Sequence, residues 1–502
     1  MTGAGHFSTA DGDVGLLSPV SASPLVAALT GDRAVLGAIL AVEAGWAAVL
    51  EKAGLAPAGS AAVVVSAADA RRYDVADIAR RAQGGGNPVI PLLADLRKNV
   101  QALDSAGIGA TTAVHTSLTS QDVLDTALML VARHTVQAVL GDLKRTAAAL
   151  AALAEQHAET LCVGRSLTQH SLPFTFGLRA AQWFHGVAAA GRHLESLELP
   201  VQFGGAAGTL AAGTALTSGT VSTPFTLADR LATQLGLAAA PAPWHTNRLA
   251  VTSLGNALAS VLDACGKIAA DVLFLSRPEV AELAEPVAAG RGVSSAMPHK
   301  QNPVLSVLVR SAALQAPGLA AQLHVAAANF NDERPDGAWH SEWPALRQLL
   351  ALSLGAAGQI GELVEGLRTY PDAMRRNLDL AGPLVLAEGV AAAVAPLLKD
   401  ADGQEGGRSG KQQLQTLVDR TLEVPAAEQG ATYRRLLREA VPANLLPDDK
   451  LAELLDPANY LGQASTISGR ILAAFPDFAG RDNSFLKTTS SAHIDANGAN
   501  HG

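Results

Sequence analysis

One polar segment of the chain combines a serine, a lysine and two flexible glycines. Residues 290–303 read GRGVSSAMPHKQNP. Gly290 and Gly292 would let this loop move, and Asn302 followed by a proline favours a helix that begins directly after it, with Asn302 as its N-cap. The hydroxyl of Ser294 would lie on this loop close to Lys300 and to a helix N-terminus, where positive potential stabilises an oxyanion.

A second polar segment, residues 114–122 (VHTSLTSQD), carries a histidine and several hydroxyls just before a long helical stretch. Thr119 could cap that helix, with Asp122 three residues further on as its reciprocal partner. The same hydroxyls and free N–H groups could instead form an anion site. The segment alone leaves both interpretations open.

A third segment, residues 164–177 (GRSLTQHSLPFTFG), places Arg165, Gln169 and several hydroxyls before another helix. Taken alone it is a weak indication of a site, because an arginine in a polar loop is usually solvated.

Long proline-poor stretches must position these segments. They predict five long helices with apolar faces, and short β-branched strands in regular order are missing, so we expect an all-α fold of three mostly helical domains around a long central bundle. The predicted helices span 120–160, 174–199, 247–277, 304–329 (with a kink at Pro317) and 345–370. The predicted domains are an N-terminal domain, 1–110, the bundle with the loop, 111–370, a C-terminal domain, 371–479, and a disordered tail, 480–502.

The amino-acid composition argues against some classes of protein. With 48% hydrophobic and 17% charged residues the chain is globular, and its net charge of −9 argues against a general nucleic-acid binder. A polyanionic substrate would therefore need a local cluster of cations. The two cysteines, Cys162 and Cys265, are expected to be buried thiols, and no residues have metal-ligand spacing. We expect no secretory signal, no segment long enough to cross a bilayer, and a cytoplasmic protein.

The three polar segments together resemble the motifs of the superfamily of fumarase, aspartase, argininosuccinate lyase and adenylosuccinate lyase, over roughly residues 15–475. Residues 290–303 look like its signature loop, 164–177 like its Arg-Thr motif, and 114–122 like its His-x-Gly-x-Thr-Ser motif. Further segments resemble the 3-carboxymuconate cycloisomerase branch of that superfamily: 86–92, 119–122, 204–210, 243–248, 333–334, 339–343 and 456–462.

This resemblance implies a mechanism and an assembly. The reaction would be the addition of a carboxylate across a double bond through an aci-carboxylate carbanion, which interconverts 3-carboxy-cis,cis-muconate and 4-carboxymuconolactone in protocatechuate degradation. It would need no cofactor. The small tricarboxylate substrate would bind in a homotetramer with a central bundle of twenty helices, at sites that three subunits share, without nucleic acid or membrane.

The resemblance also implies roles for single residues. Ser294 would move the proton, and Lys300 with Asn302 would hold the carboxylate on which charge develops. The remaining expected substrate-binding residues are hydroxyl, amide and cationic side chains: His115, Thr119, Ser120, Gln121, Arg165, Gln169, His245, Arg248 and Arg334.

Four positions depart from the superfamily pattern. Leu167 stands where fumarase and adenylosuccinate lyase commonly carry a histidine, Ser306 where many members have glutamate, and Ser117 and Val293 where glycine is usual. A carboxylate, whose acid has a pKa of about 4, attacks and leaves as an anion and needs no general acid. Leu167 therefore favours the cycloisomerase.

Two alternatives stay open. One is an adenylosuccinate- or argininosuccinate-type β-eliminating lyase of the same fold, against which Leu167 and residues 243–248 count. The other is a non-catalytic tetramer, as lens crystallins of this superfamily are. Ser294, Lys300 and Asn302 disfavour that, whereas Val293 and Ser117 mildly favour it.

Overall fold

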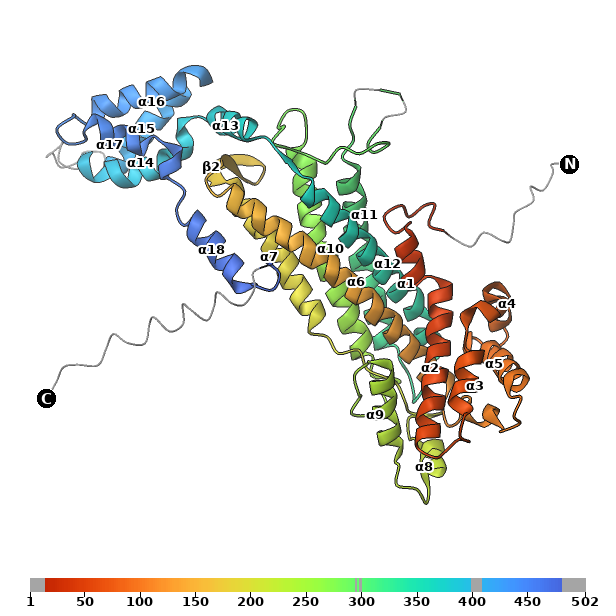
Figure 1. Ribbon diagram of the computed structural model, residues 1–502. Helices are drawn as coiled ribbons and strands as arrows, with labels where there is room; N and C mark the ends of the chain where they lie inside the picture. Colours follow the sequence, from red (N-terminus) through yellow and green to blue (C-terminus); the bar gives the residue numbers. More distant parts are fainter. Residues whose placement is uncertain (1–13, 294–295, 298–299, 399–408, 481–502) are drawn as a thin grey trace, which may run out of the picture. The chain divides into compact units, whose positions relative to one another are not determined.

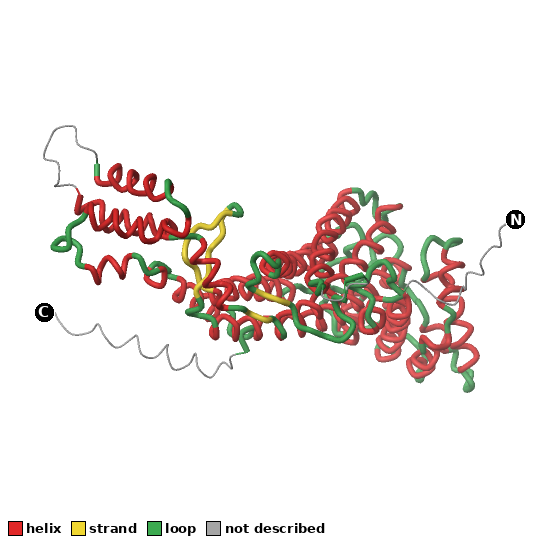
Figure 2. The backbone as a smooth tube through the Cα atoms, turned by 90° about the horizontal axis from the view of Figure 1, so that it is seen from above, coloured by secondary structure: helices red, strands yellow, loops and turns green. Residues whose placement is uncertain are grey.

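The computed structural model describes residues 14–293, 296–297, 300–398 and 409–480 (Figure 1). Ser294 and the predicted tail beyond residue 480 lie outside the described residues. Helices dominate (Figure 2), and the described strands form two short antiparallel pairs, so the predicted all-α class is confirmed. The pairs are β1 (Leu161–Ser166) with β2 (Gln169–Thr175), and β3 (Leu283–Ala284) with β4 (Arg368–Thr369).

All five predicted long helices are present. Four begin and end within a few residues of the predicted bounds. The fifth begins at Gly337 rather than 345, because the chain stays helical through Pro344, which forfeits one backbone hydrogen bond. It ends at Glu365 because Arg368 and Thr369 pair as a strand. The five are α6 (Ser120–Gln156), α7 (Phe176–Glu195), α10 (Leu249–Leu275), α11 (Val304–Ala328) and α12 (Gly337–Glu365).

Contacts divide the chain into two compact units. Unit 1 comprises the described parts of Met1–Leu143, Ala190–Gly266 and Val307–Ile360, and unit 2 those of Lys144–Ala189, Lys267–Ser306 and Gly361–Gly502. The boundaries fall inside the long helices, so each unit contains pieces of several of them.

The shorter helices of unit 1 mostly pack on one of them, α2 (Asp32–Lys52). They are α1 (Pro24–Thr30), α2 (Asp32–Lys52), α3 (Ser60–Ala67), η1 (Ala70–Arg72), α4 (Val75–Ala82), α5 (Val89–Leu103), η2 (Ala110–Ala113), α8 (Ala211–Thr217) and α9 (Pro224–Leu235). Trp46, Leu50, Phe203 and Leu231 belong to a core cluster that joins α2 to α9 and to the segment before α8. The close packing of α10 on α11 depends on Gly255, where a Cβ would lie 2.4 Å from Leu323.

Unit 2 holds the two strand pairs and a second helical core. Its shorter helices are α13 (Pro371–Leu380), η3 (Pro383–Leu386), α14 (Ala387–Val394), η4 (Ala395–Leu398), α15 (Gly410–Leu422), α16 (Ala426–Ala440), α17 (Asp448–Leu454), η5 (Pro457–Asn459) and α18 (Ala464–Ala474). Val390, Leu414, Tyr433 and Leu451 are members of the cluster that packs α14 to α17 together.

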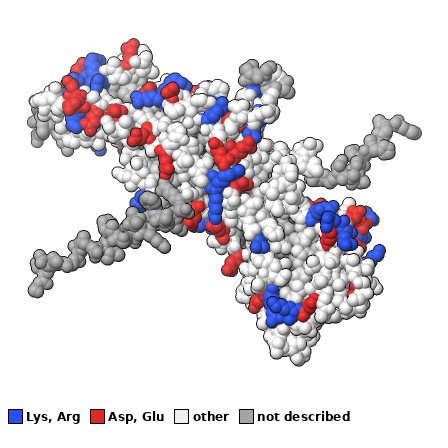
Figure 3. Space-filling model, viewed as in Figure 1, with Lys and Arg blue, Asp and Glu red and all other residues white. Residues whose placement is uncertain are grey.

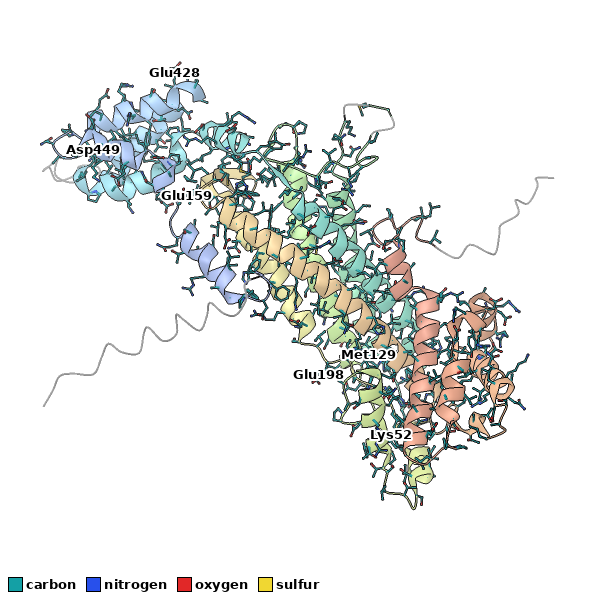
Figure 4. The ribbon with its side chains drawn as sticks, viewed as in Figure 1. Lys52, Met129, Glu159, Glu198, Glu428 and Asp449 are labelled. Atoms are coloured by element: carbon teal, nitrogen blue, oxygen red, sulfur yellow. The ribbon has the colours of Figure 1, made fainter. Side chains whose placement is uncertain are left out.

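Within the residues that the structure describes, three helical stretches are long and apolar enough to cross a membrane by length and composition: Pro24–Lys52, Ser120–Gln156 and Val304–Ala328. On this measure the expectation that no segment reaches that length is wrong. The most apolar part of Ser120–Gln156 is mostly buried (72%), and its Met129, labelled in Figure 4, is 1% exposed. The corresponding part of Val304–Ala328 is only 33% buried, and much of the face in Figure 3 carries no charged side chain.

Candidate active site

Two side chains of helix α2, Glu43 and Trp46, contact the segment 115–117. His115 Nδ1 lies 2.7 Å from Oε1 of Glu43, which is fully buried, and Trp46 Nε1 donates to the carbonyl oxygen of Thr116 at 2.8 Å. His115 and Ser117 both have left-handed backbones, with φ of 63° and 65°. Sequence reasoning missed Glu43. Its signal is that it is the one charged residue between Arg33 and Glu51 in the apolar helix α2.

The first turn of α6 is tied to distant segments of unit 1. Asp122 accepts hydrogen bonds from the backbone N–H of Thr119 (3.0 Å), Gly204 (2.9 Å) and Gly205 (3.0 Å), and it contacts His245 Nε2 at 2.8 Å. The bond from the Thr119 N–H to Asp122 is the carboxylate half of the predicted capping box. The Thr119 hydroxyl accepts from Arg334 Nη1 at 2.7 Å.

A buried ionic network lies one turn further along α6. Arg248 donates to Asp125 (2.8 and 3.0 Å) and to Glu342 (2.7 Å), and Trp339 Nε1 also donates to Asp125 at 2.9 Å. Burial alone would lower the pKa of Arg248, but the two carboxylates raise it above its usual value. Burial raises the pKa of the Glu342 carboxyl, and Arg248 offsets this only in part.

Three predicted substrate-binding residues therefore have their described partners inside unit 1. His245 and Arg248 are each 3% exposed, and Gln121, fully buried, donates to the His245 carbonyl at 2.9 Å. These contacts hold the start of α6 in place, and contact of the three residues with substrate stays a prediction. Ser120, half-buried, is the first residue of α6.

The segment 164–177 lies directly before a helix, as predicted, because α7 begins at Phe176, but its residues up to Thr175 belong to a β-hairpin rather than to a loop. Ser166 pairs with Gln169, and the turn residues Leu167 and Thr168 both have left-handed φ values, 49° and 71°. A two-residue turn of this hand matches the twist of the paired strands. Leu167 is 94% exposed at the tip.

Arg165 is held within unit 2 by a buried carboxylate. Its Nη2 donates to Glu282 Oε1 at 2.6 Å, and its guanidinium lies 5.4 Å from the centre of the Phe274 ring. Asn377 Nδ2 donates to the same Glu282 oxygen at 2.8 Å. The Arg165 charge is thus already paired, and its side chain is 12% exposed.

The two ends of the signature loop are joined to each other. The backbone N–H and the Nδ2 of Asn302 both donate to the Gly292 carbonyl, at 2.9 and 3.2 Å, and Val293 forms an antiparallel bridge with Gln301. Lys300 is exposed. A cavity of about 170 Å³ at this base is lined by polar groups that include Arg291, Gln301, Asn302 and Arg368.

Glu285, and not Asn302, caps α11. Its carboxylate, 8% exposed, accepts from the N–H groups of Leu305 (3.1 Å) and Ser306 (2.7 Å). The predicted N-cap role of Asn302 is therefore wrong, because this side chain turns back to Gly292. The two N–H groups are occupied, so they are not free to stabilise an oxyanion.

The predicted site residues thus fall into two sets. Unit 1 brings together the segment 115–122 with His245, Arg248 and Arg334, and unit 2 contains Arg165, Gln169, Lys300 and Asn302. In the part of the chain that the structure describes, no three His, Cys, Asp or Glu residues are grouped to hold a metal ion.

Comparison with known proteins identifies relatives along nearly the whole chain. The model of a family described as lyase matches residues 21–318. The chain is 44% identical to nitrosuccinate lyase of Streptomyces davaonensis, over 93% of this chain and 96% of the relative. It is 38% identical to 3-carboxy-cis,cis-muconate cycloisomerase of Bradyrhizobium diazoefficiens, over 91% and 97%.

A solved structure with a similar fold belongs to the same kind of enzyme as one of these relatives. The crystal structure of 3-carboxy-cis,cis-muconate lactonizing enzyme from Pseudomonas putida matches with a TM-score of 0.79 and 34% identity, over 92% of this chain and 99% of that one. Sequence and fold lead to the same conclusion: the chain belongs to the lyase family, within the fumarase/aspartase superfamily that its motifs resemble.

Proposed function

We propose that this chain is a cofactor-independent cycloisomerase that interconverts 3-carboxy-cis,cis-muconate and 4-carboxymuconolactone in protocatechuate degradation in the cytoplasm. The observation that carries the proposal against lyases that release hydroxide or an amine is Leu167. An apolar side chain occupies the exposed tip of the β1–β2 hairpin, so the tip offers no acid to protonate a leaving group. Enzymes that expel hydroxide or an amine benefit from such an acid, because these groups leave poorly as anions.

A carboxylate needs no general acid, either when it attacks in the lactonisation or when it leaves in the reverse reaction. In lactonisation one carboxylate oxygen bonds to an alkene carbon, and the electron pair of the double bond moves towards the neighbouring carboxylate to give the aci-carboxylate. Ser294 then donates a proton to the carbon next to it. In the reverse reaction Ser294 removes that proton, and the ring carboxylate leaves as an anion.

Cations must compensate the three negative charges of this substrate. We assign Lys300 and Asn302 to the carboxylate on which charge develops, with Thr119, Ser120 and Gln121 beside it. His115, Arg165, Gln169, His245, Arg248 and Arg334 complete the proposed binding set. In the proposed homotetramer three subunits contribute to each site.

A second candidate is the elimination of nitrite from nitrosuccinate. It is favoured by the 44% identity to nitrosuccinate lyase. Cleavage of the carbon–nitrogen bond of that substrate releases nitrite, an anion of a weak acid that departs unprotonated like a carboxylate. Leu167 fits both reactions equally, and Ser294 would remove the proton from carbon in this one.

Parallel assays of the purified protein distinguish the candidates. Turnover of 3-carboxy-cis,cis-muconate, followed by its ultraviolet absorbance, with no nitrite from nitrosuccinate, is the result expected. Nitrite release without muconate turnover would assign the second function. Fumarate release from adenylosuccinate or argininosuccinate would contradict both, as would a folded tetramer that is inactive towards all four compounds.

A further inference from the structure

We infer that Thr119 is a positioning residue, whose hydroxyl holds Arg334 so that the guanidinium binds a carboxylate of the substrate. The inference rests on the proposed function in one respect, namely that a carboxylate-bearing substrate binds beside the segment 115–122. It refines that proposal, because the anion is assigned to Arg334 and Thr119 acts through it. Three features carry the inference: the contact between the two side chains, the way the start of α6 is capped, and the charge of Arg334.

Thr119 stands at the N-cap position of α6, but its hydroxyl has a different partner. The oxygen of an N-cap side chain usually accepts a hydrogen bond from an N–H of the first helical turn. Among the described residues, Thr119 Oγ1 accepts instead from Arg334 Nη1, at 2.7 Å. The Thr119 N–H donates to Asp122 at 3.0 Å and the Thr119 carbonyl accepts from the Val123 N–H at 3.3 Å. The backbone of Thr119 is thus fixed on both sides, which gives its hydroxyl a defined place.

Arg334 differs from the other two arginines of the proposed binding set in how its charge is compensated. Arg165 donates to the buried Glu282, and Arg248 lies between two buried carboxylates. Arg334 forms no ion pair within the described part of the chain, although three acidic residues lie within two positions of it in the sequence. A guanidinium stays charged at any physiological pH. The positive charge of Arg334 is therefore free to attract an anion.

The contact with Thr119 leaves one edge of the Arg334 guanidinium for a ligand. A guanidinium carries five N–H groups, and the described contact uses one of them, on Nη1. The edge formed by Nε and Nη2 can donate two parallel hydrogen bonds to a single carboxylate. A hydroxyl orients the guanidinium without cancelling its charge, whereas a carboxylate in the same place would compensate that charge and compete with the substrate.

The segment that carries Arg334 is anchored on both sides of this residue. The centre of the Phe330 ring lies 5.0 Å from the Arg248 guanidinium, and Trp339 Nε1 donates to Asp125 at 2.9 Å. All of these residues belong to unit 1, as does the start of α6. An arginine held in this way loses little conformational freedom when an anion binds, which favours affinity.

The first test is a calorimetric titration at pH 8 with propane-1,2,3-tricarboxylate, and with succinate as a second probe. Thr119→Val keeps the shape of the side chain but removes the acceptor, and the Kd should rise roughly tenfold because Arg334 is no longer oriented in advance. Thr119→Ser restores a hydroxyl and should bind within about twofold of the wild type. Arg334→Gln removes the charge and should raise the Kd roughly 30-fold or more.

A double variant separates the positioning role from an independent effect of each residue. If Thr119 acts through Arg334, then Thr119→Val should add no further change in Kd to Arg334→Gln. Losses that multiply in the double variant would overturn the inference. So would a Thr119→Val protein whose Kd stays within about twofold of the wild type.

Thr223 supplies a matched control for helix capping. It is the N-cap of α9, and its hydroxyl accepts from an N–H of its own helix, that of Thr226, at 3.2 Å. Thr223→Val should lower the midpoint of thermal unfolding and leave the Kd unchanged. Thr119→Val should raise the Kd and lower the midpoint less. The opposite pattern would assign the Thr119 hydroxyl to helix stability and reject its positioning role.

The binding measurements keep this inference separate from the proposed function. The expected pattern in a protein that does not turn over the muconate would sustain the role of Thr119 and reject the cycloisomerase. Muconate turnover with the same KM in the wild type and in Thr119→Val would sustain the cycloisomerase and reject the role of Thr119. A wild type that binds neither probe would also reject it.

Discussion

Asp125 and Glu43 are both buried acidic side chains of unit 1, but the protein compensates them differently. Asp125 faces Arg248, which Glu342 holds from the other side, and it also accepts from Trp339. Among the described residues, Glu43 has a histidine as its partner. A guanidinium stays charged at any physiological pH, so Asp125 keeps its counter-charge over that whole range.

The two buried carboxylate contacts of Arg248 predict a large loss of stability in Arg248→Met. Two carboxylates would stay buried without their cation, which costs about 3–5 kcal/mol. Burial already raises the pKa of the Glu342 carboxyl, and without Arg248 nothing would offset that rise. The deficit should therefore be greatest at pH 8 and should shrink as the pH falls towards 5, where the folded Glu342 carboxyl takes up a proton.

The urea concentrations at the midpoint of unfolding, at pH 5 and at pH 8, measure the loss of stability of Arg248→Met. Arg71→Met is the control, because solvent screens its ion pair with Asp69 (87% and 31% exposed) and the pair should contribute little to stability. A deficit for Arg248→Met no larger than that of the control would show that the network does not depend on its cation.

The proposed mechanism predicts that Ser294→Ala lowers turnover roughly 10²–10⁴-fold, the usual contribution of a positioned acid or base. Oligomeric state and urea midpoint should not change. Turnover within about threefold of the wild type would remove Ser294 from the mechanism.

Among the secondary-structure elements, α11 begins where Glu285 binds its first free N–H groups. The cap comes from a residue about twenty positions earlier in the chain and could not be predicted from local sequence. Asn302-Pro303 carries the usual start signal, yet the helix begins at Val304 and the Asn302 side chain closes the base of the loop instead. The start signal of Asn302-Pro303 therefore has less effect on where α11 begins than the buried Glu285 carboxylate.

This difference predicts unequal effects of two alanine substitutions on stability. Glu285→Ala leaves the N–H groups of Leu305 and Ser306 buried without acceptors and should cost about 2 kcal/mol. Asn302→Ala removes one side-chain bond, while the backbone bond to Gly292 remains, and should cost less than about 1 kcal/mol. Thermal unfolding of the two variants compares them, and the reverse order would restore Asn302 as the cap.

The other elements were predictable to different degrees. Apolar stretches with little proline were enough to predict five long helices, but Pro344 placed the expected start of the last one eight residues late. The hairpin at 161–175 was missed because Leu167-Thr168 lacks the Asn-Gly signal of its turn. Motif residues such as His115 and Arg165 could be selected from sequence, whereas their partners Glu43 and Glu282 depend on contacts over 72 and 117 positions.

At the scale of the whole molecule, α11 presents an apolar face to solvent. Val307 (48%), Leu314 (71%) and Val325 (56%) are exposed, and their spacing places them on one side of the helix, with Val307 and Val325 about five turns apart. Apolar faces of this length usually mark an interface. Sister chains in the proposed homotetramer would cover it, which also accounts for a hydropathy typical of membrane spans.

Leu314→Glu should therefore shift the assembly from tetramer to smaller species, because a carboxylate would be buried at the interface without a partner. Leu422→Glu, at another exposed leucine (59%), in α15, should leave the assembly intact. Sedimentation velocity measures both. A tetrameric Leu314→Glu protein, or a wild type that sediments as a monomer, would contradict the proposed interface.

The closed base of the signature loop has a consequence for evolution. Since Gly292 and Asn302 are bonded to each other, the residues between them could be exchanged for those of a homologue while α11 keeps its own anchor in Glu285. The reaction catalysed could then change through exchange of this short segment alone, while the helices around it stay the same. The relatives of this chain already include both a cycloisomerase and a lyase.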